Sequence, residues 1–345
     1  MMKFSFISGK GGVGKTTLAI NSARLISRKS NVLLIDCDII NRGATYLIFP
    51  QENDRSLNDK FITISNIISN ENYELLIKNR NLTKIRDRLF FIPVGYLNDN
   101  QKINTNNEKE IKVFLEKIEK IAEICNIEVV IFDCSPTLDN LIGNITKNTE
   151  FNLLITETTN VAFRGTEHLK SQLLEFYKVN PDTIHIILNK ADEDYLFSEL
   201  GSKYKNAIEK LLKVIDVIGI IPYDDRIIKT FEEENKFFID TISKSLATKQ
   251  LENILYNLTK NTELDSNLIF GKHLEAGSIK LRTIERIIFR LRKFFIPLLG
   301  FYFMIIAFFV TISELNYYLS PTLIIVLLLY LIGILMVMYN LVRKV

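Results

Sequence analysis

Short apolar runs alternate with segments of helical spacing over the first 255 residues. Seven runs predict strands: Lys3–Ser8, Asn31–Ile35, Leu89–Val94, Ile127–Phe132, Asn152–Thr156, Thr183–Leu188 and Val214–Ile220. Helical spacing occurs in Thr16–Ser27, Glu108–Cys125, Arg164–Tyr177, Leu200–Leu212 and Lys236–Leu258. Several of the strand runs are continuously apolar, as in a parallel sheet that helices cover on both faces. The pattern therefore predicts an α/β fold with a doubly wound, mostly parallel sheet.

The pattern changes after residue 260. Residues 261–278 have weak periodicity and predict a linker. In residues 280–293, Ile284, Ile287, Ile288 and Leu291 share one helical face, while Arg282, Arg286 and Arg290 recur at every fourth position. This predicts a basic amphipathic helix at the level of lipid headgroups. An ordinary helix packed on the domain is the alternative.

The last segment contains two long apolar stretches. Residues 294–313 and 315–342 carry no charge, and each is long enough to cross a bilayer, which takes about 20 apolar residues. Lys and Arg flank the pair on both outer sides and are absent from the turn between them. The positive-inside rule then puts both flanks in the cytoplasm. We expect an α-helical two-span hairpin in the inner (cytoplasmic) membrane, with both termini cytoplasmic.

These patterns divide the chain into three parts: a nucleotide-binding domain (1–260), a linker with the basic helix (261–293), and the two-span hairpin with a short tail (294–345). Much of the net charge of +3 belongs to the end of the chain, because residues 272–293 hold seven Lys or Arg against two Glu. The remainder is slightly acidic, so we expect a lipid bilayer rather than nucleic acid as a partner. Three scattered cysteines are typical of a reducing cytosol.

The chemistry begins directly after the first predicted strand. Residues 9–17 read Gly-Lys-Gly-Gly-Val-Gly-Lys-Thr-Thr and lead into a predicted helix. Such a loop turns its backbone N–H groups toward phosphate oxygens. We therefore expect Gly11, Gly12, Val13, Gly14, Lys15, Thr16 and Thr17 to bind a nucleoside triphosphate. Lys15 should reach the β- and γ-phosphates, and the Thr16 hydroxyl should hold Mg²⁺.

Carboxylates end two other predicted strands. Asp36 and Asp38 follow one apolar run, and Asp133 follows another. Because the carboxyl ends of parallel strands meet at one edge, these groups should face the phosphate loop. There they can orient a water and hold Mg²⁺, with Asp133 acting on the metal through a water. Helix-capping aspartates are the alternative for the first pair.

Lys10 is an additional cation in the loop. Lys15 already neutralises the terminal phosphates, so Lys10 is free to point outward, toward phosphates that another subunit holds. A cation given in trans would stabilise the transition state as an arginine finger does. A solvated loop lysine is the alternative.

With Lys10, residues 9–17 resemble the deviant Walker A motif of the MinD/ParA ATPases, and the resemblance covers residues 2–255. It implies ATP and Mg²⁺ as cofactors and a homodimer on ATP binding that Lys10 completes. It also implies that Asp38 positions the attacking water, that Asp36 supports the Mg²⁺ shell, and that Arg42 lies in a switch region. MinD-type chains usually end in a reversible amphipathic helix, so the added spans imply permanent anchoring.

The preference for adenine or guanine depends on the residues that follow the predicted strand Thr183–Leu188. Asn189-Lys190-Ala191-Asp192 matches the guanine signature Asn-Lys-x-Asp of GTPases, in which the aspartate binds the base. The family it resembles instead has Asn followed by a basic residue, with the Asn on adenine, and a second base-contacting loop that matches Pro222. We favour ATP, and a GTP-dependent switch remains the alternative.

Together these features predict a membrane-anchored ATPase switch. Hydrolysis would control the recruitment, positioning or energising of an unidentified membrane or cytoplasmic protein. One alternative is a tyrosine-kinase-like regulator of polysaccharide export, although such chains place their spans before the kinase domain. A non-hydrolysing scaffold is another. A metal carrier using Cys37 and Cys134 is disfavoured, because neither cysteine has a partner at metal-ligand spacing.

Overall fold

A computed structural model describes residues 1–69, 77, 82–97, 107–192, 217–232, 237–260 and 262. The chain divides into two units, Met1–His273 and Leu274–Val345, and all described residues belong to the first. The predicted helix Leu200–Leu212, the basic helix and both predicted spans lie outside the described residues. In the parts that the structure describes, no helix is both long and apolar enough to cross a bilayer. The two boundaries between the three predicted parts stay predictions.

Eight strands form one sheet. They are β1 (Met2–Ile7), β2 (Val32–Cys37), β3 (Thr83–Arg86), β4 (Leu89–Ile92), β5 (Val129–Cys134), β6 (Phe151–Thr156), β7 (Ile184–Ala191) and β8 (Val217–Pro222). Their order is β3-β4-β2-β5-β1-β6-β7-β8. Every neighbouring pair is parallel except β3 and β4. This confirms the mostly parallel sheet and the seven predicted strands. β3 was not predicted.

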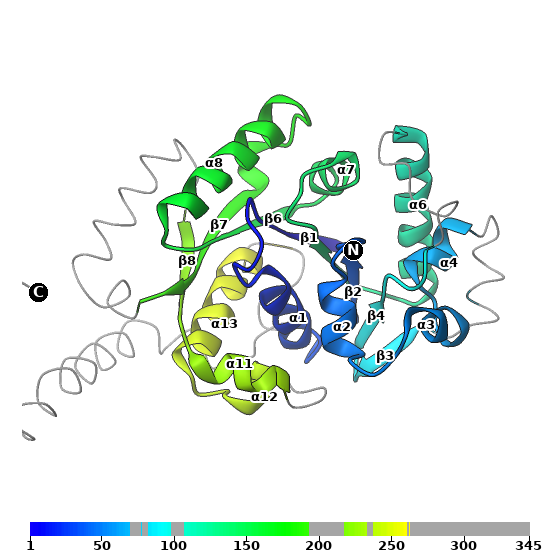
Figure 1. The fold of residues 1–345 in the computed structure, drawn as a ribbon, viewed down its shortest axis with the longest axis horizontal. Helices are drawn as coiled ribbons and strands as arrows, with labels where there is room; N and C mark the ends of the chain where they lie inside the picture. The colour runs from blue at the N-terminus through cyan, green and yellow to red at the C-terminus, as the bar shows by residue number, and fades with distance from the viewer. Residues whose placement is uncertain are drawn as a thin grey trace, which may run out of the picture. The chain divides into compact units, whose positions relative to one another are not determined.

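Helices cover both faces of this sheet (Figure 1). One face carries α6 (Glu108–Ile124), α7 (Asn140–Lys147) and α8 (Asn160–Glu175). The other carries α1 (Lys15–Ile26), α2 (Gly43–Ile48), α11 (Asp225–Glu232), α12 (Phe238–Thr241) and α13 (Leu246–Thr259). Two apolar clusters, one on each side, bury the sheet between them. The predicted doubly wound fold is confirmed.

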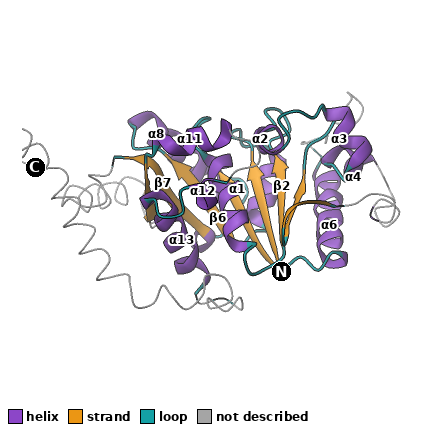
Figure 2. Cartoon of the chain, turned by 90° about the horizontal axis from the view of Figure 1, so that it is seen from below, coloured by secondary structure: helices purple, strands orange, loops and turns teal. Residues whose placement is uncertain are grey.

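The short helices α3 (Asp54–Lys60) and α4 (Ile64–Ser69) lie at the β3 side of the sheet (Figure 1), and Figure 2 shows them beside α6. A single 3₁₀ turn, Pro181–Thr183, precedes β7. β1 lies near the middle of the sheet, and the chain adds β2 on one side of it and β6 on the other. A crevice at the carboxyl ends of such strands is where ligands bind in open α/β sheets.

The predicted helix Lys236–Leu258 is wrong as a single element. Of its residues, the structure describes those from Phe237 onward, which form α12 and α13 with a break between them. Ser245 causes the break, because its hydroxyl accepts the Thr248 N–H at 3.1 Å and so begins a new helix. The Thr248 hydroxyl donates back to the Ile242 carbonyl at 3.0 Å and closes the turn.

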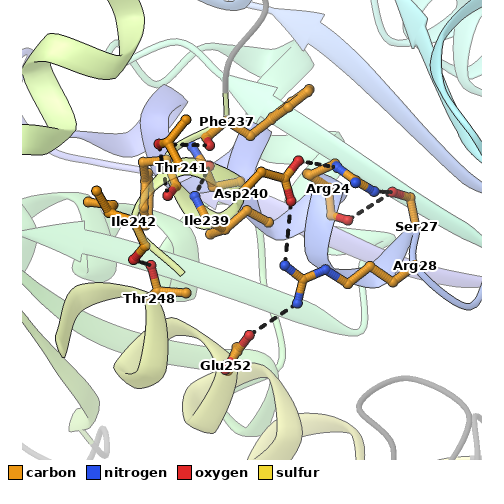
Figure 3. Close-up of polar contacts among 12 residues, drawn as sticks. Arg24, Ser27, Arg28, Phe237, Ile239, Asp240, Thr241, Ile242, Thr248 and Glu252 are labelled. Carbon is orange, nitrogen blue, oxygen red and sulfur yellow. Dashed lines mark hydrogen bonds and ion pairs between the residues drawn. The ribbon is translucent and has the colours of Figure 1, made fainter. Parts of the chain in front are cut away.

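Ion pairs connect these last helices to α1 (Figure 3). Arg24 Nε lies 2.8 Å from Asp240 Oδ2, and Arg28 contacts both Asp240 at 3.5 Å and Glu252 at 3.2 Å. The α1 helix begins at the phosphate loop, so α12 and α13 support it from the opposite end. The described C-terminal segment therefore stabilises the helix that positions the loop.

Candidate functional site

The loop between β1 and α1 has the conformation that a phosphate site needs. Gly12 and Gly14 have φ values of +79° and +89°, which favour glycine. Gly14 is the N-cap of α1, so the free N–H groups of the first turn face the loop. A Cβ on Gly9 would overlap the carbonyl oxygen of Gly165 in α8. The loop is thus packed against α8 and open on its other side.

Lys15 is paired with Asp133 inside the site. Its ammonium donates to Asp133 Oδ1 at 2.6 Å, and the exposed fractions of the two side chains are 7% and 0%. Burial opposes the charged form of Lys15, but neighbouring negative groups, chiefly Asp133, outweigh it and raise the Lys15 pKa. Burial also raises the pKa of the Asp133 carboxyl, and the Lys15 ammonium acts in the opposite direction. The 2.6 Å contact makes each group the other's partner inside the site.

Asp36 lies beside Asp133, because the two are register neighbours on β2 and β5. Burial, with repulsion from Asp133, raises the pKa of Asp36 to about 7. Its Oδ2 accepts the Thr45 N–H and hydroxyl, both at 2.8 Å, and its Oδ1 accepts the Asp38 N–H at 3.1 Å. Asp36 thereby holds the loop between Asp38 and Thr45. Its predicted metal role stays a prediction.

Asp38 lies at the start of this loop. Asn41 donates its backbone N–H to Asp38 Oδ1 at 3.1 Å, and its amide nitrogen lies 3.0 and 3.1 Å from the two carboxylate oxygens. Asn41 therefore fixes the direction of the Asp38 carboxylate, which sequence reasoning did not foresee. Arg42 follows at φ +54° and forms an ion pair with Asp54.

A cavity of about 720 Å³ opens over the phosphate loop. Its wall contains most of the predicted site residues and several that were not predicted. The predicted ones are Gly11, Gly12, Val13, Gly14, Lys15, Thr16, Thr17, Asp38, Asn189, Lys190 and Pro222. The others include Asn41, Leu47, Tyr223, Asp224, Ile227 and Ile228. One wall can bind phosphates, and the apolar wall around Tyr223 can pack against the face of a base.

Residues at the end of β7 form hydrogen bonds to the phosphate loop. Asn189 Nδ2 donates to the Val13 carbonyl at 2.8 Å, and the Lys190 ammonium donates to the Gly12 carbonyl. Lys190 has φ +55°, a left-handed conformation that turns its side chain over the loop. Asp192 is not among the described residues that line the cavity.

Lys10 lies near the mouth of the site with 45% of its side chain exposed. Its ammonium is 3.7 Å from Glu157 Oε2, and Glu157 Oε1 is 3.0 Å from the Lys190 ammonium. Glu157 was missed by sequence reasoning, because a single carboxylate after a predicted strand has no motif of its own. Its position directly after β6 was the available signal.

The residues present fit a Mg²⁺ ion bound with phosphates. Asp133 Oδ2 is buried and has no hydrogen-bond partner, while the Thr16 hydroxyl lies beside this carboxylate. Hydroxyl, carboxylate and phosphate oxygens are the ligands of Mg²⁺ in such sites. Among the described residues no group of three His, Cys, Asp or Glu could hold a metal by itself. The nucleotide would have to supply part of the coordination.

Cys37 and Cys134 are buried register neighbours on β2 and β5. Burial raises the pKa of both thiols, so they stay protonated near neutral pH. A metal carrier needs thiolates. The pair packs within the sheet, which disfavours the metal-carrier alternative.

Comparison with known proteins agrees with this geometry. Residues 4–237 match the CobQ/CobB/MinD/ParA nucleotide binding domain. An uncharacterized ATP-binding protein of Methanocaldococcus jannaschii is 26% identical over 295 residues, which cover 82% of this chain and 91% of that protein. This share of the chain exceeds residues 1–260, so the similarity reaches beyond the predicted nucleotide domain.

Two solved structures show the same fold. A ParA family ATPase from Chlorobium tepidum is 21% identical, with a TM-score of 0.57, covering 72% of this chain and 96% of that chain. The MinD cell division protein of Aquifex aeolicus is 20% identical, with a TM-score of 0.56, covering 76% and 98%. At this identity the likeness concerns the fold alone.

Proposed function

Since the chain belongs to the CobQ/CobB/MinD/ParA nucleotide-binding family, we propose that it is a Mg²⁺-dependent ATPase switch anchored in the cytoplasmic membrane. Two ATP-bound copies pair through Lys10, and hydrolysis separates them. The cycle changes the surface offered to a membrane or cytoplasmic protein, which is thereby recruited, positioned or energised.

One observation supports the ATPase activity most. The three groups that phosphoryl transfer to water requires come together at one edge of the sheet: a loop that binds phosphates, the buried pair Lys15–Asp133, and Asp38 with its direction fixed by Asn41. A scaffold that only binds nucleotide does not need an oriented carboxylate. This favours hydrolysis over the non-hydrolysing alternative.

Each residue of the site has a separate role in the proposed hydrolysis. The Lys15 ammonium turns from Asp133 to the β- and γ-phosphate oxygens. Thr16 and Asp133 would hold Mg²⁺, and the bound ion would supply positive charge that neutralises the phosphate oxygens. Asp38 accepts a hydrogen bond from the attacking water and orients it. The N–H groups at the start of α1 bind the phosphate oxygens.

The position of Lys10 supports the proposed pairing of two copies. Lys10 is half exposed near the phosphate loop. Phosphates bound to the same subunit would already be contacted by Lys15. Ile40 and Val161, which follow β2 and β6, are also exposed at this edge of the sheet and are available for contact with a second copy. The donated ammonium would stabilise charge in the transition state.

The resemblance to the family supports ATP over GTP. Asn189, the basic Lys190 after it, and Pro222, which match the family's base-contacting positions, all line the cavity. GTP remains the alternative nucleotide. Competition of both nucleotides for a bound fluorescent analogue decides between them.

Membrane anchoring rests on the two uncharged stretches of residues 294–313 and 315–342 and on their basic flanks. Extraction of a membrane fraction with alkaline carbonate tests it. An integral hairpin keeps the chain in the pellet, and release into the supernatant would contradict it.

The ATPase activity is tested with the full chain in detergent. We expect slow hydrolysis that needs Mg²⁺ and falls by at least about 100-fold in Asp38→Asn, while ATP binding stays within about threefold. Activity that Asp38→Asn leaves unchanged would remove the proposed role of this carboxylate.

A further inference from the structure

Glu157 occupies a position that the proposed cycle has not used. It is the first residue after β6, and β6 pairs with β1 through Phe6↔Leu153 and Ile7↔Leu154. Because β1 leads into the phosphate loop, the Glu157 side chain emerges beside that loop. Only 18% of this side chain is exposed.

The two Glu157 oxygens contact two different lysines. Oε1 lies 3.0 Å from the Lys190 ammonium, and Oε2 lies 3.7 Å from the Lys10 ammonium. The Lys190 ammonium also donates to the Gly12 carbonyl. A single carboxylate therefore connects Lys10 to the opposite side of the loop.

The ion pairs around the loop form an inner pair and an outer group of different strength. Asp133 neutralises Lys15 inside the site at 2.6 Å, where both side chains are buried. Outside, the single negative charge of Glu157 faces the two ammonium groups of Lys190 and Lys10. The Lys10 pair is longer and half exposed, and such pairs are weak and screened by salt. Of the two Glu157 contacts, the one to Lys10 is therefore the easier to break.

We propose that Glu157 is a positioning residue that holds Lys10 against its own subunit and so raises the protein concentration at which two copies pair. This rests on the proposed function, in which Lys10 serves the partner's phosphates. Lys10 cannot stay beside Glu157 and also reach across the interface. Dimerisation therefore has to break the Lys10–Glu157 ion pair in each of the two copies, which weakens the dimer.

Neutralising Glu157 should strengthen the dimer. One exposed pair is worth about twofold to fivefold in an equilibrium constant, so two copies give roughly a 4- to 25-fold lower dissociation constant. The gain should shrink at high salt, because salt already weakens the pair in the wild-type chain.

The experiment measures dimerisation of the full chain in detergent by sedimentation, with a saturating non-hydrolysable ATP analogue and Mg²⁺. Glu157→Gln removes the charge and keeps an acceptor for Lys190, so the loop stays supported. Glu157→Asp retains the charge but shortens the side chain, so its dissociation constant should lie between those of wild type and Glu157→Gln. Glu175→Gln is the matched control, because it makes the same change at the exposed far end of α8.

The outcomes separate the two proposals. A 4- to 25-fold tighter dimer in Glu157→Gln but not in Glu175→Gln supports the positioning role. A wild-type chain that pairs with the analogue, with Glu157→Gln no tighter than Glu175→Gln, overturns this inference and leaves the dimer intact. A wild-type chain that stays monomeric with the analogue overturns the proposed dimer and the role of Glu157 with it.

Discussion

Lys15 and Asp133 form a buried ion pair 2.6 Å long between the phosphate loop and the end of β5. The lysine predicted to bind phosphates therefore has an internal partner. In the proposed function, nucleotide binding would exchange this partner and free Asp133 for Mg²⁺. The pair is thus expected to affect both stability and function.

The first prediction concerns the stability of this pair. Lys15→Met keeps the length of the side chain but leaves the Asp133 carboxylate buried and unpaired. We expect the free energy of unfolding to fall by about 3 kcal/mol. Chemical unfolding of the nucleotide-free chain, followed by circular dichroism, measures it.

The double variant Lys15→Met/Asp133→Asn is the control. It removes the unpaired charge, so it should recover more than half of the lost stability. If the double variant is less stable by the sum of the two single effects, the residues are not coupled as described.

The second prediction concerns pH. The Asp36 carboxyl has a pKa of about 7 in the folded chain and 3.8 as its ordinary value. Between these values the folded state holds a proton that the unfolded state has released. Raising the pH from 4 to 7 therefore lowers the free energy of unfolding through this group, by roughly 2–4 kcal/mol, and above pH 8 the effect is constant.

Asp36→Asn tests this directly, because it removes the titrating proton. Unfolding midpoints of both chains at pH 5 and pH 7.5 give the comparison. We expect wild type to lose more stability than the variant over this interval. An equal loss in both chains would show that Asp36 does not titrate there.

The third prediction concerns the packing of the loop. Gly9→Ala places a methyl group against the carbonyl of Gly165 and the backbone nitrogen of Thr166. These are backbone atoms of α8, so relieving the overlap requires the helix or the loop to shift. We expect a loss of about 1–3 kcal/mol in the free energy of unfolding without nucleotide. Gly11→Ala is the matched control, because a Cβ there meets no atom within 4 Å. It should change stability by less than about 0.5 kcal/mol. A control as damaging as Gly9→Ala would contradict the packing.

Much of the sheet could be predicted from the sequence, because buried parallel strands are continuously apolar and leave a clear pattern. β3 could not, since Thr83–Arg86 is short and mostly polar on an edge. The break before α13 was missed because the apolar periodicity continues across it. Only the hydroxyl of Ser245, which caps the new helix, marks that boundary.

The candidate site also contains residues that the sequence predicts and residues that it does not. Lys15, Thr16, Asp38 and Asp133 follow strands or a glycine-rich loop at fixed spacing, so their meeting could be predicted. Asn41 and Glu157 act through contacts that depend on the path of a loop and on the neighbour of β6 in the sheet. No spacing along the chain encodes those contacts.

The central claim is that Lys10 acts on the partner's nucleotide, and a mixing experiment tests it most directly. Lys10→Ala keeps its own Asp38, and Asp38→Asn keeps a Lys10 to donate. Each variant alone should hydrolyse ATP at least about 100-fold more slowly than wild type while still binding it. In an equimolar mixture, half of the dimers are mixed and each has one complete site. We predict that the mixture regains roughly a quarter of wild-type turnover. A mixture as inactive as its two components would contradict the account, because Lys10 would then act only within its own subunit.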